Sequence, residues 1–96
     1  MADRYQGDYG ETIAITTTGM ALETADTVVL RVRYPGADVG TYVEWSPVVI
    51  DEQTVSYVLE TEDILEPGLY VGTVYAVYLD QIRSSSPFYL TVGRTP

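Results

Sequence analysis

The sequence predicts an all-β fold, an antiparallel β-sandwich of about seven strands built as a single domain over residues 1–96. Short runs of β-branched and aromatic residues are separated by Gly, Pro, Asp and Ser, which is typical of strands joined by turns. Within these runs the apolar residues recur at every second position, the period of a strand that buries one face. The chain has 96 residues, 46% of them apolar and 20% charged, which is enough for one modest core and too little for two domains.

Each predicted strand is bounded by residues that favour turns. The strands cover residues 12–17, 27–34, 41–45, 48–50, 54–60, 69–79 and 82–92. Pro35-Gly36 ends the second strand, and Pro47 separates the third from the fourth. The last strand is expected to break near Ser84 to Pro87. Thr61 to Leu65 is expected to form one helical turn with Thr61 as its N-cap. We also expect a short N-terminal arm over residues 1–10 and a frayed C-terminus over residues 93–96.

Composition and charge argue against several classes of function. The formal net charge is −9, from 14 acidic and five basic residues, whereas binding to nucleic acid requires clustered Lys and Arg. The absence of Cys and His removes disulfides, thiolate metal sites and the commonest general base. No stretch approaches the ~20 apolar residues of a membrane span. We therefore expect no enzymatic activity, no cofactor, no small-molecule substrate and no contact with nucleic acid or membrane.

Two segments carry residue types that occur in functional sites. Glu60, Glu62, Asp63 and Glu66 form an acidic run that resembles a calcium site in composition, since hard cations take carboxylates. Because the EF-hand spacing is absent, a capped turn with solvated charges is favoured, and calcium binding stays open. Ser84 to Ser86 offers hydroxyl groups without a base placed to activate them, so a loop is favoured over a nucleophile.

The segment from Leu59 to Tyr70 resembles the entry to strand F of immunoglobulin-like domains. Leu59, Asp63 and the run Pro67-Gly68-Leu69-Tyr70 carry the resemblance. It implies that Tyr70 is a corner tyrosine, whose hydroxyl bonds to backbone a few residues upstream, and that Trp45 is the core tryptophan on strand C. Gly72 stands where true immunoglobulin domains have a Cys, so the resemblance concerns architecture only.

A second resemblance covers almost the whole chain. Residues 7–10, 28–36, 63–70 and 86–92 resemble small immunoglobulin-like phage tail and baseplate proteins, including the N-terminal domains of baseplate upper proteins. The resemblance implies a structural protein of a phage virion, in the tail, baseplate, neck or head, that assembles in several copies with itself and with other virion proteins. Residues 1–8 contain no signal-peptide pattern, in keeping with synthesis in the host cytoplasm. The alternatives are a bacterial surface or carbohydrate-binding module and, least favoured, an enzyme subunit.

One strand is apolar on both faces. If Tyr70 points inward, the opposite face of its strand shows Leu69, Val71, Thr73, Tyr75 and Val77. By the same alternation, with Trp45 and Phe88 inward, Tyr42 and Tyr89 point outward on neighbouring strands. The other sheet is expected to have a wetter outer face, marked by Thr27, Arg31, Arg33 and Ser56. Contiguous Val and Tyr side chains on one outer face predict a protein interface. The alternatives are that residues 5–9 cover this face or that a bulge shifts the alternation.

Overall fold

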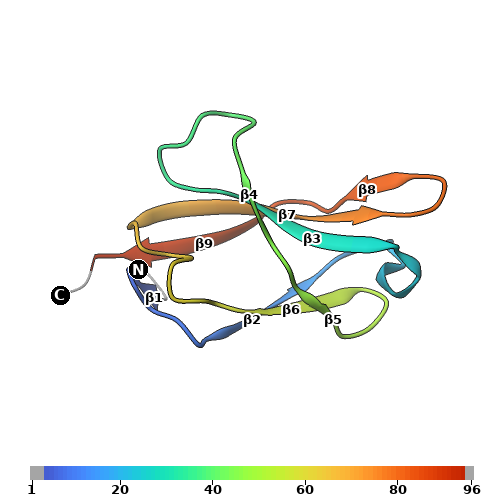
Figure 1. Ribbon diagram of the computed structural model, residues 1–96, viewed down its shortest axis with the longest axis horizontal. Coiled ribbons are helices and arrows are strands. Elements are labelled where there is room, and N and C mark those ends of the chain that lie inside the picture. The colour runs from blue at the N-terminus through green and yellow to red at the C-terminus, as the bar shows by residue number, and fades with distance from the viewer. Residues whose placement is uncertain (1–3, 95–96) are drawn as a thin grey trace.

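Two β-sheets face each other in the computed structural model, which describes residues 4–94, and the all-β sandwich is confirmed (Figure 1). The larger sheet consists, in spatial order, of β1 (Arg4–Tyr5), β9 (Phe88–Gly93), β7 (Gly68–Val77), β3 (Thr27–Arg33) and β4 (Val43–Trp45), with β8 (Ile82–Ser84) paired to β7. The smaller sheet consists of β2 (Thr12–Thr16), β6 (Thr54–Val58) and β5 (Val48–Val49). A 3₁₀ turn at Leu22–Thr24, which the sequence did not predict, leads into β3.

The strand order is that of an immunoglobulin-like sandwich. β9, β7 and β3 occupy the places of strands G, F and C, while β2, β6 and β5 occupy those of B, E and D. All strand pairs are antiparallel except β1 with β9, which run parallel.

Two sequence-based placements of strands are wrong, one in its sheet and the other in its position within a sheet. β3, with Thr27, Arg31 and Arg33, lies beside β7 in the larger sheet and not in the other sheet. Trp45 comes from the edge strand β4 and not from the strand C position. Alternation along a strand shows which residues share a face, whereas the choice of neighbouring strand depends on pairing over long sequence distances.

The break in the last predicted strand is confirmed and has a local cause. β8 and β9 pair with the same edge of β7, at Tyr75–Val77 and at Gly68–Gly72 respectively. Between them Ser85 bonds to Val74 twice: the Ser85 amide donates to the Val74 carbonyl at 2.9 Å, and the Ser85 hydroxyl accepts from the Val74 amide at 2.8 Å. Pro87, which follows, has no amide hydrogen to donate to a ladder.

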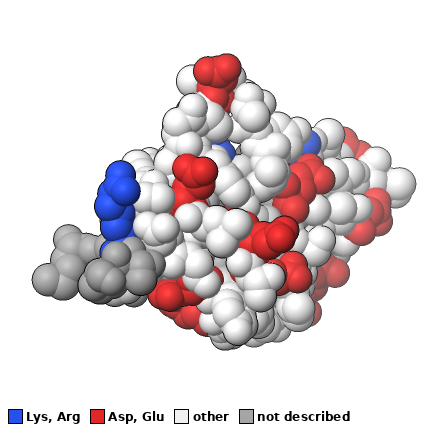
Figure 2. All heavy atoms as spheres, turned by 60° about the vertical axis from the view of Figure 1, so that its left-hand side comes forward, with Lys and Arg blue, Asp and Glu red and all other residues white. Residues whose placement is uncertain are grey.

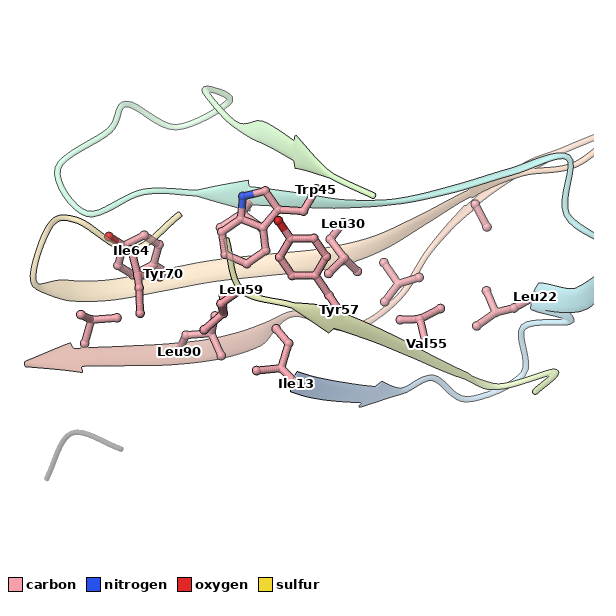
Figure 3. Close-up of a cluster of buried hydrophobic side chains, with 14 of the residues drawn as sticks. Ile13, Leu22, Leu30, Trp45, Val55, Tyr57, Leu59, Ile64, Tyr70 and Leu90 are labelled. Atoms are coloured by element: carbon pink, nitrogen blue, oxygen red, sulfur yellow. The ribbon is translucent and has the colours of Figure 1, made fainter. Parts of the chain in front are cut away.

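Aromatic side chains fill one half of the core (Figure 3). Tyr70 and Trp45 are 0% and 4% exposed, so both point inward as the strand alternation predicts. The ring of Trp45 stacks on Tyr57 with centroids 4.9 Å apart, and the ring of Tyr34 lies edge-on to those of Trp45 and Tyr70. The Trp45 indole also donates to the Tyr34 hydroxyl at 3.4 Å. These contacts join the edge strand β4 to the centre of the sandwich.

The turn before β7 is the tyrosine corner. The Tyr70 hydroxyl donates to the Glu66 carbonyl at 2.6 Å, four residues upstream, which is the bond that the immunoglobulin resemblance implies. The expected helical turn capped by Thr61 is not formed, and residues 61–64 are a hydrogen-bonded turn. Asp63 takes the capping role: its carboxylate accepts from the Glu60 amide at 2.8 Å and from the Tyr57 hydroxyl at 2.6 Å. The bond to Tyr57 ties this turn to β6.

The two ends of the described chain lie together at the edge of the larger sheet. Arg4 and Tyr5, in the expected N-terminal arm, form β1, and the Gln6 amide donates to the Gly93 carbonyl at 2.9 Å. The expectation of fraying from Gly93 onward is therefore wrong at Gly93, which ends β9. The rest of the arm and of the expected frayed end, residues 1–3 and 95–96, lie outside the described residues.

Candidate protein interface

The outer face of the larger sheet is the side of β3, β4, β7, β8 and β9 that points away from the smaller sheet. The structure places all six predicted interface residues there: Tyr42, Leu69, Val71, Tyr75, Val77 and Tyr89. Tyr42, Leu69 and Tyr89 are 43%, 50% and 59% exposed. Val71, Tyr75 and Val77 are half-buried by their neighbours on the sheet.

Strand register extends this face beyond the predicted residues. Tyr75 pairs with Val29 of β3, and Val77 pairs with Ile82 of β8. Sequence reasoning missed Val29 because β3 was assigned to the other sheet. It missed Ile82, which is 60% exposed, because local patterns do not determine where β8 pairs along β7. Cross-strand neighbours in register have Cβ atoms about 5 Å apart, so the apolar surface is continuous across β3, β7 and β8.

Arg31 lies over two of the tyrosines on this face. Its guanidinium carbon is 3.5 Å from the ring centroid of Tyr75 and 4.4 Å from that of Tyr42. Its Nε also contacts the Glu44 carboxylate at 3.4 Å. Contacts of this kind contribute about 0.5–2 kcal/mol each, depending on how well water is excluded. The ring face of Tyr75 is therefore already occupied within the chain, whereas Tyr89 is not covered in this way.

Arg33 is placed differently from Arg31. Its register neighbour on β7 is Val71, which in turn pairs with Tyr89. The Arg33 residue is partly buried, and its side chain makes no ion pair or hydrogen bond with any other described side chain. A shallow depression of about 290 Å³ lies beside it, walled by Val71 and by Gly40 and Thr41 of the loop that rises above the sheet between β3 and β4 (Figure 1).

Acidic side chains are almost excluded from the described strands. Glu44 is the one acidic residue that lies within a strand among residues 4–94, whereas four of the five basic residues lie in strands. The other described acidic residues lie in turns and loops. Figure 2 shows several separate acidic patches spread over the visible face, with fewer basic ones. The chain thus combines acidic turns and loops with a larger sheet whose outer face is apolar and carries arginine.

The acidic run at residues 60–66 has a structural role in the turn. Asp63 is committed to Tyr57 and to the Glu60 amide, whereas Glu62 and Glu66 are exposed. No group of three acidic side chains within residues 4–94 lies close enough together to hold a metal ion. Burial, followed by the bond to Asp63, raises the pKa of the Tyr57 hydroxyl far above its usual value of 10.0.

The fold and this surface define a class: a small immunoglobulin-like β-sandwich with an apolar, arginine-bearing outer sheet face. Comparison with models of protein families gives no match, and comparison with curated proteins gives none either. Within the described residues, no helix has the length and apolar character that crossing a membrane requires.

Proposed function

We propose that this protein is a non-enzymatic structural protein of a phage virion, placed in the tail, baseplate, neck or head, and that it assembles in several copies through the outer face of the larger sheet. One observation carries the proposal. β7 is apolar on both faces, and its inner face alone supplies the core with Tyr70, Val74 and Ala76, each 0% exposed. The apolar residues on its outer face are not needed to bury the core, and apolar surface of this kind typically marks contact with another protein.

The resemblance to small phage tail and baseplate proteins gives the proposal its location in the virion. It rests on the order of elements and on turn residues, including the corner at residues 63–70, and so it is an argument by analogy. Part of the terminal arm could have covered the face instead. The described part of that arm, however, bonds elsewhere: the Gly7 amide donates to the Ile64 carbonyl and the Gly10 amide to the Leu59 carbonyl. These bonds hold the described part of the arm, from residue 4 onward, beside residues 59–64 and not over the outer face of β7.

A carbohydrate-binding module is the alternative function. Such modules need aromatic ring faces that are free to stack on sugars. On this sheet Arg31 occupies the ring face of Tyr75 and lies over the ring of Tyr42, which favours a protein partner. Binding of soluble glycans by the wild-type protein, with no self-association, would support the alternative.

The test is a pair of matched double variants. Val71→Asp with Tyr75→Asp should leave the chain folded and abolish multimers or incorporation into particles, because both side chains lie outside the core. Thr12→Asp with Thr16→Asp adds the same charge at the same four-residue spacing on the outer face of the smaller sheet. This control should change neither folding nor assembly. Sedimentation velocity measures assembly, and far-UV circular dichroism measures folding. Wild-type assembly by the first variant would contradict the proposal. If that variant unfolds, Tyr89→Asp at a 59% exposed position provides the same test.

A further inference from the structure

Arg33 is the basic residue of the described chain whose position calls for a partner. Arg4 is paired with Glu11, Arg31 with Glu44, and Arg83 and Arg94 are exposed to water. Among residues 4–94, Arg33 is the one basic residue that is partly buried and has no acidic side chain of the same residues paired with it. A guanidinium that is partly withdrawn from water and flanked by Val71 is stabilised when a carboxylate pairs with it.

The depression beside Arg33 has room for a protruding side chain. Its volume is about 290 Å³, and Arg33 and Val71 present a charged and an apolar wall side by side. A carboxylate next to an apolar side chain matches these two walls. Centrally placed arginines and tyrosines next to apolar residues are the side chains that most often dominate the energy of a protein interface.

The turn at residues 60–66 of the same chain has this complementary chemistry. Glu62, Leu65 and Glu66 point outward, and Leu65 is 53% exposed. The turn is held in place from inside by Ile64, which is 1% exposed, and by the Tyr70 hydroxyl on the Glu66 carbonyl. A turn that is already ordered loses little conformational entropy when it binds.

We propose that the depression beside Arg33 receives the 62–66 turn of a second copy of this chain. Glu62 or Glu66 pairs with Arg33, and Leu65 packs against Val71 and Tyr89. This inference rests on the proposed function, since it names the partner of the same sheet face. It also accounts for how copies with a net charge of −9 associate: the acidic turn of one copy meets a basic part of the next, not another acidic surface.

Charge reversal with mixing tests the pairing. Arg33→Glu alone, and Glu62→Arg with Glu66→Arg in one chain, should each raise the dissociation constant for self-association by about tenfold or more. An equimolar mixture of the two variants should associate as the wild type does, because each turn then meets a depression of opposite charge. Arg83→Glu, and Glu23→Arg with Glu52→Arg in one chain, make the same changes of charge at exposed positions and should leave association unchanged. Sedimentation velocity over a concentration series measures every case.

Each alternative result identifies a different error. If Val71→Asp with Tyr75→Asp abolishes association and Arg33→Glu does not, the sheet is the interface and the role of Arg33 is wrong. If Arg33→Glu abolishes self-association and mixing fails to restore it, the depression receives a different acidic part of this chain, and the assignment of the 62–66 turn is wrong. A wild-type protein that stays monomeric at every concentration while it still enters particles overturns the second copy as occupant and leaves the proposed function standing.

Discussion

The two faces of β7 are both apolar, but they differ in what covers them. The inner face packs against the smaller sheet, and Tyr70, Val74 and Ala76 are fully buried there. The outer face, with Leu69 and Val71, has no second sheet above it. Alternation and apolarity identify the two faces of a strand, but they do not determine which partner covers each face. The inner partner belongs to the chain, and we propose that the outer one comes from another molecule.

The smaller sheet shows that an apolar outer face is not a general need of this fold. Its outward positions include Thr12, Ala14 and Thr16 on β2, and Thr54 and Ser56 on β6. Val48 on β5 and Val58 at the end of β6, which are 64% and 51% exposed, are apolar exceptions. Thr satisfies the conformational preference of a strand while leaving a hydroxyl for water. The Val and Tyr residues on the outer face of β7 therefore require an explanation other than strand formation.

The largest expected effect separates the inner and outer faces at β4. Trp45→Ala should lower the free energy of unfolding by ~3–5 kcal/mol, because it removes a buried ring that stacks on Tyr57. Tyr42→Ala, three residues earlier on the outer face, should lower it by less than ~1 kcal/mol, since it loses one exposed contact with Arg31. Urea denaturation, followed by tyrosine fluorescence and by circular dichroism, measures the free energy of unfolding of both variants. Equal losses in the two variants would remove the distinction between the faces.

The second prediction concerns alkaline pH and the inner tyrosines. Burial raises the pKa of Tyr34, Tyr57 and Tyr70 above the usual value of 10.0, and Asp63 adds to the effect at Tyr57. A raised pKa in the folded state means that the stabilising contribution is complete below about pH 10 and is lost as the pH rises further, because the unfolded chain ionises first. The free energy of unfolding should therefore fall steeply between about pH 10 and pH 12.

Phenylalanine variants test which side chains cause this fall. Tyr57→Phe should make the alkaline decrease shallower, whereas Tyr89→Phe, at a 59% exposed position, should leave its slope unchanged. Denaturant midpoints at a series of pH values give both slopes. A free energy of unfolding that stays constant up to about pH 12 would contradict the coupling of these buried hydroxyls to folding.

The positions of the strands along the chain were more predictable from the sequence than the pairing between strands was. The strands, the break before Phe88 and the inward direction of Tyr70 all follow from local alternation and turn residues. The placement of β3 beside β7 does not, because both sheets have equally plausible local patterns. The contact of Arg31 with Tyr75 depends on that placement and was therefore missed. The sequence predicts a helical turn at Asp63, whereas in the structure the Asp63 carboxylate bonds to Tyr57 of β6. Local sequence does not show that β6 lies beside this turn.

The smallest predicted effect is a difference between two tyrosines, one in β7 and one just past its end, whose hydroxyl groups are both buried. The hydroxyl of Tyr70 donates to the Glu66 carbonyl at 2.6 Å, whereas that of Tyr78, just past the end of β7, is buried and has no hydrogen-bond partner among the described residues. Removing a bonded hydroxyl loses the bond and leaves the Glu66 carbonyl unpaired, so Tyr70→Phe should lower the free energy of unfolding by about 0.5–1.5 kcal/mol. Burying a hydroxyl without a hydrogen-bond partner is unfavourable, and Tyr78→Phe removes this cost. The variant should therefore leave the free energy of unfolding unchanged or raise it by up to ~1 kcal/mol. Thermal and urea unfolding of the two variants measure the difference directly. A loss in Tyr78→Phe as large as that in Tyr70→Phe would mean that ring packing, and not the corner hydrogen bond, sets the contribution of both residues.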